Sequence, residues 1–230
     1  MKLAAYFCTR SKHESETLAY QSLTKIQESI TSSDTSFHIY HDTNNTIGLS
    51  KNYNKILDKL SKEYDYILFI HDDVFVDDFN ICNKLTKAHK LYDIVGLAGG
   101  INPTIKNPAL WHLMCGSFHG GNLRGSVAHY ANNDQLFMTN FGVTPDRVAV
   151  LDGLFLSVST KAVQKTGWRF NENYTFHHYD IASCLDANKK KLKLGVYPIW
   201  VIHRSPGLLN PSDKLFVDSQ TKFLEEYSNY

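Results

Sequence analysis

The chain of 230 residues lacks an excess of charge of either sign and contains no long apolar run. Its 24 basic and 23 acidic residues give a formal net charge of +1, so no strong overall field attracts nucleic acid or an anionic membrane. The longest apolar stretch, around residues 194–202, is well short of the ~20 residues that a membrane-spanning helix needs. We therefore expect no nucleic-acid partner and no transmembrane segment, while peripheral contact with a membrane stays open.

The chain is also poor in features of secreted or metal-knuckle proteins. Its four cysteines, Cys8, Cys82, Cys115 and Cys184, lie far apart and form no C-x-x-C pair. This spacing argues against a zinc knuckle, a redox motif and a dense disulfide scaffold. The apolar run over residues 3–8 is short and is followed by Thr-Arg-Ser-Lys, not by a small-residue cleavage site. We expect reduced thiols, a first strand at residues 2–8 and a cytoplasmic protein.

Hydrophobic residues make up 43% of the chain and aromatic residues 13%, which excludes an intrinsically disordered protein. The length fits one domain. Within the first hundred residues, apolar runs at 36–41, 66–70 and 94–98 alternate with helical patterns at 49–60 and 84–92. A first helix is expected to begin at Ser11, because Ser11 and Glu14 have capping-box spacing. Strands separated by helices predict an α/β fold with a mostly parallel central sheet flanked by helices, which is Rossmann-like.

The second half of the chain is less regular. Residues 99–140 are rich in Gly, Asn, Pro and aromatic residues and show no clear periodicity, as is typical of a functional loop region. Further strands are expected at 148–151, 153–158 and 192–202, with helices at 161–165 and 180–188.

Two neighbouring carboxylates follow the most apolar strand. His71, Asp72 and Asp73 come directly after residues 66–70, at the edge of an open α/β sheet where ligands bind. Carboxylates at such an edge can hold a divalent cation that also contacts diphosphate oxygens. The alternative is a polar loop in which an aspartate caps a helix.

Several motifs together, in this order along the chain, resemble those of GT-A type nucleotide-sugar glycosyltransferases, in particular the family-two-like group with the streptomycin-biosynthesis-type domain. The resemblance spans residues 2–207 and lies in the segments 48–54 (GLSKNYN), 66–74 (YILFIHDDV), 151–156 (LDGLFL), 170–173 (FNEN) and 176–181 (FHHYDI). The segment 66–74 resembles the strand of that fold that ends in a D-x-D motif.

The resemblance implies a GT-A fold, with a nucleotide-binding half at residues 1–100, an acceptor-side half at 101–207 and a C-terminal tail or helix at 208–230. It also implies a nucleotide-diphosphate sugar as donor and a hydroxyl group of a glycan, lipid-linked or protein-linked molecule as acceptor. When residues 71–73 are aligned with the D-x-D motif, His71 takes the place of the first aspartate, Asp72 is the middle residue and Asp73 is the metal-binding aspartate.

The expected cation is Mn²⁺ or Mg²⁺, held by Asp73 and His203. His203 ends the last expected strand, from which it can return to the same edge of the sheet. An imidazole beside a carboxylate suits Mn²⁺ better than Mg²⁺. The alternative for His203 is a surface or core histidine.

The base that removes the acceptor's proton stays open among three residues. Asp152 and Asp180 each follow an apolar run, where partial burial can raise the pKa of a carboxyl group. His178 occupies the place where relatives carry the base in an E-D-x-D segment, since this chain reads His177-His178-Tyr179-Asp180. The alternatives are a turn residue for Asp152 and a helix cap for Asp180.

The donor nucleotide is expected along the ends of the first strands. The resemblance assigns this role to Thr9, Arg10, Asp42, Gly48, Leu49, Asn52, His71 and Asp72. Aromatic residues in the irregular stretch, namely Trp111, His112, Phe118, His119 and Tyr130, can either stack on a sugar ring or pack the loop.

These features predict a metal-dependent glycosyltransferase that inverts by direct displacement, with retention still open. One alternative is a sugar-nucleotide nucleotidyltransferase, which usually needs a glycine-rich loop after the first strand, and residues 9–13 contain no glycine. The other is a non-catalytic nucleotide- or carbohydrate-binding module of the same fold.

Overall fold

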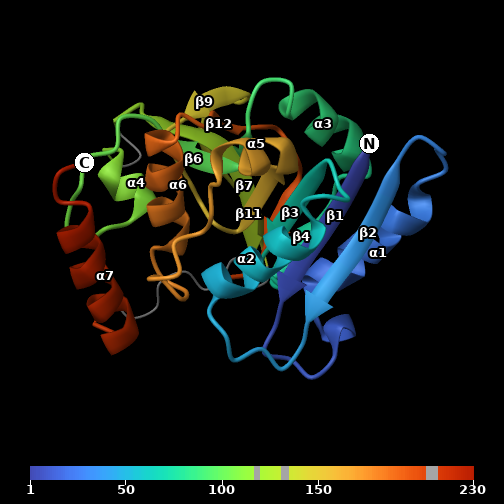
Figure 1. Cartoon of the computed structure of the whole chain (residues 1–230), viewed down its shortest axis with the longest axis horizontal. Helices are drawn as coiled ribbons and strands as arrows, with labels where there is room; N and C mark the ends of the chain where they lie inside the picture. Colours follow the sequence, from blue (N-terminus) through green and yellow to red (C-terminus); the bar gives the residue numbers. More distant parts are fainter. Residues whose placement is uncertain (117–119, 131–134, 206–211) are drawn as a thin grey trace.

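A seven-stranded sheet organises the computed structural model, which describes residues 1–116, 120–130, 135–205 and 212–230 (Figure 1). In spatial order its strands are β2 (Ser36–Asp42), β1 (Lys2–Cys8), β3 (Tyr66–Ile70), β11 (Phe155–Ser159), β5 (Ile94–Gly96), β12 (Leu194–Val196) and β9 (Asp146–Val148). Strands β2, β1, β5 and β12 run in the direction of β3, whereas β11 and β9 run the opposite way. The expected α/β fold with a mostly parallel central sheet is therefore confirmed.

A second sheet lies beside the first and has the order β10 (Val150–Leu151), β6 (Ala98–Gly100), β7 (Leu123–Tyr130), β13 (Val201–His203) and β4 (Val74–Val76), with β8 (Leu136–Gly142) paired to β7. The sequence predicts single strands over 94–98 and 192–202, and both predictions are wrong. Each run divides, since β5 and β12 belong to the first sheet and β6 and β13 to the second. The chain also passes between the sheets at residues 71–73 and 152–154.

Seven α-helices surround the sheets in the described part of the chain. They are α1 (Leu18–Ser29), α2 (Leu49–Leu60), α3 (Ile81–Ala88), α4 (Trp111–Met114), α5 (Thr160–Thr166), α6 (Tyr179–Lys189) and α7 (Lys214–Glu226), and a 3₁₀ turn covers Glu14–Glu16. Tyr20 of α1 contacts His41 of β2, whereas Tyr64, which follows α2, contacts His38 and Tyr40. Because side chains alternate along a strand, α1 and α2 cover opposite faces of the sheet.

The first helix begins later than its sequence pattern predicts. Helix α1 starts at Leu18, where the hydroxyl of Thr17 accepts a hydrogen bond from the Tyr20 amide. Ser11 is not its cap, because the Ser11 amide instead donates to the hydroxyl of Thr9 in a turn. The apolar stripe is as expected, since Ala19, Leu23 and Ile26 are buried.

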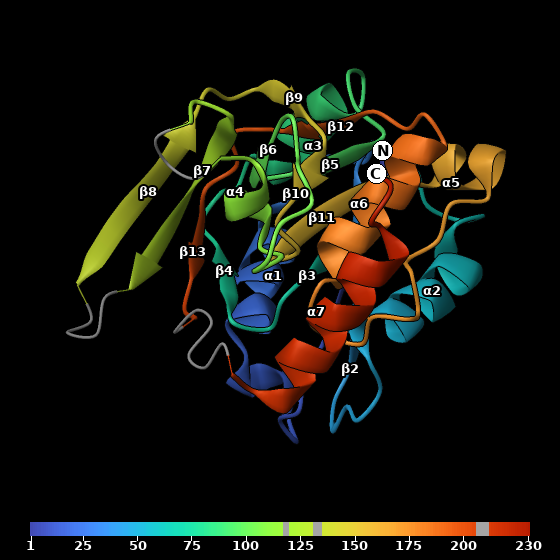
Figure 2. The same cartoon turned by 90° about the vertical axis from the view of Figure 1, so that its left-hand side faces the viewer.

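The stretch 99–140, expected to be irregular, contains α4 and most of a long antiparallel hairpin of β7 and β8 (Figure 2). In Figure 2 the hairpin projects from the body of the molecule. A register shift at Gly125 and Ser126 breaks the alternation of β7, which explains why periodicity gives no signal there. Gly125 has φ +91°, and a Cβ atom on it would lie 1.8 Å from the Leu97 carbonyl oxygen.

The buried apolar residues form one cluster that extends from Leu3 to Tyr227. At its centre the ring of Tyr53 lies 4.5 Å from that of Phe69 and 5.1 Å from that of Phe170, in tilted and edge-on contacts. Helix α7 packs beside α6, where the Tyr227 hydroxyl donates to the carbonyl of Ala182 (Figure 1). All four cysteines are buried and unpaired. Among the helices of the described residues, none is both long and apolar enough to span a bilayer.

Candidate functional site

The candidate site lies where the chain passes from the first sheet to the second. Strand β3 ends at Ile70 and β4 begins at Val74, so His71, Asp72 and Asp73 form the connection. On the neighbouring strand β13, His203 is paired with Val74 of β4 on one side and with His129 of β7 on the other. This register brings His203 to Asp73 from more than a hundred residues away in sequence.

Asp73 and His203 are in direct contact. Nε2 of His203 lies 3.3 Å from Oδ1 of Asp73, and one ligand atom each from His71, Asp73 and His203 lie within 4.8 Å of one another. Burial alone would raise the pKa of Asp73, but the neighbouring His203 outweighs it and the pKa lies below its usual value. Burial would likewise lower the pKa of His203, and Asp73 instead raises it. The two residues therefore favour each other's charged forms.

The donor set fits a divalent transition metal. Oδ1 of Asp73 is buried and lies 3.3 Å from Nε2 of His203, in an ion-pair contact that lacks hydrogen-bond geometry. Two imidazoles and one carboxylate suit Mn²⁺ and its neighbours in the first transition row better than Mg²⁺. Burial lowers the pKa of His71, which keeps the imidazole neutral and able to bind a metal. The residues present thus fit such an ion.

The structure brings together Asp73 and His203, which the sequence assigns to metal, and it adds His71, which the sequence assigns to the donor nucleotide. Sequence reasoning misses His129, whose ring lies 5.8 Å from that of His203. It falls in the stretch without periodicity, so no pattern points to it.

Two carboxylates line the next part of the site, at the turn between β10 and β11. The carboxylate of Asp152 accepts hydrogen bonds from Nε1 of Trp111 at 2.9 Å and from the amide of Leu154 at 3.1 Å. Asp180, in the first turn of α6, accepts one from the amide of Gly153 at 3.0 Å. Burial and the nearby charge of Asp152 raise the pKa of Asp180 to about 7. Asp180 can therefore hold or release a proton near neutral pH.

His178 lies outside this group, so its assignment as the base gains no support from its contacts. It precedes α6 in a left-handed conformation with φ 63°, and its side chain turns toward α7. Its ring packs between Phe216 and Phe223, with centroids 5.0 and 5.5 Å away, and Nδ1 bonds the Ser219 hydroxyl. Burial lowers the pKa of His178 to about 4, which makes it a weak base.

The residues at the ends of β1 and β2 lie at the same edge of the sheet, but their polar groups are largely engaged within the protein. Thr9 is buried, and its hydroxyl accepts from the Ser11 amide. The carboxylate of Asp42 accepts a hydrogen bond from the Tyr6 hydroxyl at 2.7 Å. Arg10, by contrast, is exposed. Of Thr9, Arg10 and Asp42, Arg10 is the residue best able to contact a ligand.

Groups at the start of α2 are also engaged in contacts within the protein. The Leu49 amide donates to the carbonyl of Thr175 at 2.6 Å, and a Cβ atom on Gly48 would lie 2.8 Å from Cα of Thr175. Buried Asn52 donates to Oδ1 of Asn45 at 2.8 Å. Gly48, Leu49 and Asn52 thus hold the loop after β2 in place, and their assignment to the donor nucleotide stays a prediction.

Asp72 is partly exposed, and its backbone carbonyl accepts a hydrogen bond from the Ala19 amide of α1. This bond fixes the connection between β3 and β4 against the start of α1. The side chain of Asp72 thus remains at the edge of the sheet where the sequence places the donor.

The aromatic residues of the irregular stretch 99–140 lie in different surroundings. Trp111 is buried and bonds Asp152, so it supports the turn. The pKa of half-buried His112 is lowered by burial, and the Arg204 guanidinium lies 4.6 Å above the Tyr130 ring. Phe118 and His119 lie outside the described residues.

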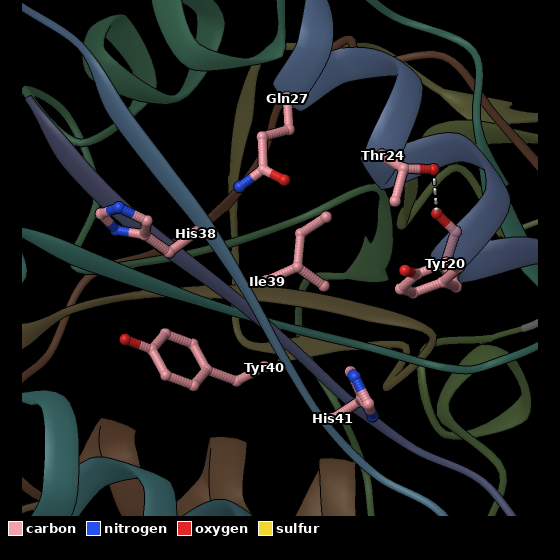
Figure 3. Close-up of a pocket in the computed structure, with 7 residues that line it drawn as sticks. All are labelled: Tyr20, Thr24, Gln27, His38, Ile39, Tyr40 and His41. Atoms are coloured by element: carbon pink, nitrogen blue, oxygen red, sulfur yellow. Dashed lines mark hydrogen bonds between the residues drawn. The ribbon is translucent and has the colours of Figure 1, made fainter. Parts of the chain in front are cut away.

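A separate hollow of about 330 Å³ lies between α1 and the edge strand β2 (Figure 3). It is lined by Tyr20, Thr24, Gln27, His38, Ile39, Tyr40 and His41. Figure 3 shows the hydroxyl of Thr24 bonded to the backbone carbonyl of Tyr20. The lining includes no residue of the candidate site and no carboxylate, so this hollow is not the predicted cation site.

Comparisons with known proteins agree with this architecture. The model of a family described as "Glycosyltransferase like family" matches residues 12–227, whereas no curated protein matches the chain. Among solved structures, A197 from STIV is similar with a TM-score of 0.50 and 14% identity, covering 88% of this chain and 85% of A197.

Two further structures have TM-scores of 0.55. TarS from S. aureus is 12% identical to this chain in sequence, and the matched region covers 100% of this chain. GalNAc-T7, solved with UDP, GalNAc and Mn²⁺, is 10% identical and covers 99% of it. The chain spans only 40% of TarS and 49% of GalNAc-T7. At these identities the likeness shows the fold alone.

Proposed function

The chain belongs to the glycosyltransferase-like family, and from this premise we propose that it moves a sugar from a nucleoside-diphosphate sugar to a hydroxyl group of a carbohydrate or glycoconjugate, with a divalent cation. The resemblance and the enzyme class expected from the sequence are confirmed by the family match over residues 12–227. The donor, the acceptor, the cation and the stereochemical course are parts of the proposal.

The observation that carries the proposal is the meeting of His71, Asp73 and His203, which place one ligand atom each within 4.8 Å of one another, with Oδ1 of Asp73 buried. These three residues would hold the cation, and the Mn²⁺ in the GalNAc-T7 structure supports testing that ion first. When bound, such an ion neutralises the negative charge that grows on the leaving diphosphate. The UDP in the same neighbour supports uridine nucleotides as the first probes.

Asp180 is our choice for the base. Its pKa of about 7 lets it be ionised at neutral pH and still accept a proton. The acceptor's O–H proton passes to the Asp180 carboxylate as the acceptor oxygen bonds the anomeric carbon. The bond from that carbon to the diphosphate oxygen breaks, and its electron pair leaves with the diphosphate. Asp152, the neighbouring carboxylate, contributes to the raised pKa of Asp180.

This course is a direct displacement with inversion, and retention is the alternative outcome of a product analysis. Arg10, exposed after β1, is the residue that we expect to contact the nucleotide or its phosphates. Three residues with hydrogen bonds inside the protein, namely Thr9 after β1, Asp42 at the end of β2 and Asn52 of α2, would shape the surface on which the nucleotide rests.

A thermal-shift panel tests the proposal. UDP, GDP and ADP are each added with and without Mn²⁺, because a ligand that binds the folded state raises the melting temperature. We expect one nucleotide to raise it further when Mn²⁺ is present. Asp73→Asn and His203→Ala should each abolish the metal-dependent part, whereas His13→Ala, an exposed histidine far along the chain from these residues, should retain it. If both site variants respond like the parent, the metal site is wrong.

A non-catalytic binding module is the second candidate, and donor hydrolysis separates the two. An enzyme should release the nucleoside diphosphate slowly from a donor sugar in water, and the release should depend on Mn²⁺. A binding module should shift in melting temperature and release nothing.

A further inference from the structure

Tyr179, the first residue of α6, joins two parts of the candidate site through its hydroxyl group. The Tyr179 oxygen lies 2.8 Å from Nε2 of His71 and 2.8 Å from the carbonyl oxygen of Gly153. Tyr179 is buried, and a tyrosine hydroxyl carries its one proton at neutral pH. The roles proposed above, metal binding by His71 and proton transfer at Asp152 and Asp180, do not require this contact.

The number of protons decides the direction of both bonds. A tyrosine hydroxyl has one proton to donate, and a carbonyl oxygen can only accept. The proton of Tyr179 therefore goes to the Gly153 carbonyl, and the hydroxyl oxygen accepts from His71. Nε2 of His71 must carry the hydrogen, because two lone pairs would otherwise face each other at 2.8 Å. In the neutral ring, Nδ1 is then the nitrogen with the free lone pair.

We propose that Tyr179 is a positioning residue that holds His71 in the tautomer protonated on Nε2 and thereby keeps Nδ1 available for a divalent cation. The use of Nδ1 rests on the proposed function, whereas the tautomer does not. Partners of this kind, which bond the second nitrogen of a metal-binding histidine, fix its tautomer and ring orientation in known metal sites.

The packing around Gly153 supports the role of Tyr179. A Cβ atom on Gly153 would lie 2.2 Å from the Tyr179 hydroxyl oxygen, so this approach requires glycine. The Gly153 amide donates to Asp180, the residue after Tyr179, so both polar groups of Gly153 are bound by the start of α6. The His71 amide donates to the Leu154 carbonyl at 3.0 Å. Tyr179 thus ties the connection that carries Asp73 to the turn that carries Asp152.

The tautomer can be measured in the metal-free protein. Long-range ¹H–¹⁵N NMR spectra distinguish a ring protonated on Nε2 from one protonated on Nδ1, and the His71 signals are identified by their loss in His71→Gln. We expect His71 of the parent to be protonated on Nε2 at neutral pH. Protonation on Nδ1 in the parent would overturn the proposal without any variant that has to fold.

Two substitutions extend the measurement. Tyr179→Phe should let His71 populate both tautomers. Tyr174→Phe is the matched control, because it also removes a tyrosine hydroxyl with a hydrogen bond, here to Glu226 at 2.9 Å, on the side of α7. The control should leave the His71 spectrum of the parent unchanged. An unchanged His71 spectrum in Tyr179→Phe would show that Tyr179 does not set the tautomer.

Mn²⁺ affinity, measured by electron paramagnetic resonance of the free ion, tests the consequence. Tyr179→Phe should weaken binding by about 10–100-fold, the usual effect of losing such a partner. In a His71→Ala background the same substitution should change nothing further, because Tyr179 acts through His71. Equal losses in both backgrounds would contradict the proposal. A parent that has the expected tautomer but binds no Mn²⁺ would instead refute the proposed function.

Discussion

Two neighbouring stretches of the same sheet edge differ in how their polar groups are used. Asp42, at the end of β2, bonds Tyr6, and Asn52 of α2 bonds Asn45 in the loop after β2. After the end of β3, Oδ1 of Asp73 is buried in an ion-pair contact with His203, next to His71. A position at this edge of the sheet therefore does not by itself identify a functional residue, because both stretches lie there. The better guide is a group of side chains that can bind a metal ion and that segments distant in sequence bring together.

The difference concerns what each group stabilises. Losing the hydrogen bond of a buried group costs about 1–3 kcal/mol, so the bond between Asn52 and Asn45 contributes to the stability of the fold. Asp73 and His203 instead stabilise each other's charged forms at a place where three side chains that can bind a metal ion meet. Substitution of Asn52 should therefore lower stability, whereas substitution of Asp73 or His203 should abolish metal binding.

The largest effect is expected for Asp180→Asn. If Asp180 is the base, kcat should fall by about 10²–10⁴-fold, the usual contribution of general-base catalysis. The parent rate should rise with pH through about 7, as Asp180 loses its proton, and then level off. The variant should lose this rise. The measurement is the transfer rate from pH 5.5 to 8.5 with the donor nucleotide that the thermal panel identifies.

Asp186→Asn provides the control, since Asp186 lies on the same helix and its carboxylate bonds Asn171 and Lys189 outside the site. It should retain the rate and the pH profile of the parent. If Asp180→Asn behaves in the same way, the base lies elsewhere, and Asp152→Asn becomes the variant to measure.

A smaller effect, on stability instead of rate, is expected for Asn52→Ala. The variant loses the bond to Asn45 in a buried position, which should lower the free energy of unfolding by about 1–3 kcal/mol. The kcat of the folded variant should stay within a few-fold of the parent. Urea denaturation and steady-state kinetics measure the two quantities.

Asn83→Ala is the comparison for this variant, because Asn83 also donates to an asparagine, Asn80, but is exposed. Its unfolding free energy should change by less than about 0.5 kcal/mol. A large loss of kcat in Asn52→Ala without loss of stability would mean that the two stretches do not differ as argued.

The sequence could predict those parts of the site that depend on local pattern. His71, Asp72 and Asp73 are found because a strand buried on both faces reads as a continuous apolar run, and its end is easy to locate. Asp152 and Asp180 are found for a similar reason. The α1 and α2 stripes and the direction of the main sheet follow from the alternation of strands and helices.

The rest depends on contacts between distant segments. The division of residues 94–100 between two sheets is invisible in an apolar run, and the pairing of β13 with β4 that brings His203 to Asp73 has no local signal. The sequence likewise gives no sign that α7, some forty residues later, covers His178 with Phe216 and Phe223. Tyr179 is missed because its partners, His71 and Gly153, come from two other connections.

The last expected effect concerns the dependence of stability on pH. The pKa of Asp180 is about 7 in the folded protein and near the ordinary 3.8 when the chain is unfolded. Between these values the folded state binds a proton that the unfolded state has lost. Asp180 therefore makes the free energy of unfolding fall as pH rises from about 4 to 7. Asp73, whose pKa is lowered in the folded protein, acts in the opposite direction at lower pH.

The difference between the parent and Asp180→Asn isolates the first contribution, because the amide does not titrate and can still accept the Gly153 hydrogen bond. Urea unfolding at pH 4.5, 5.5, 6.5 and 7.5 should give a variant that gains stability relative to the parent at each step up to about pH 7. A difference that stays constant over this range would mean that Asp180 has an ordinary pKa. The acidic group that serves the reaction would then have to be sought on the Asp152 side of the turn, where the Trp111 indole bonds the carboxylate.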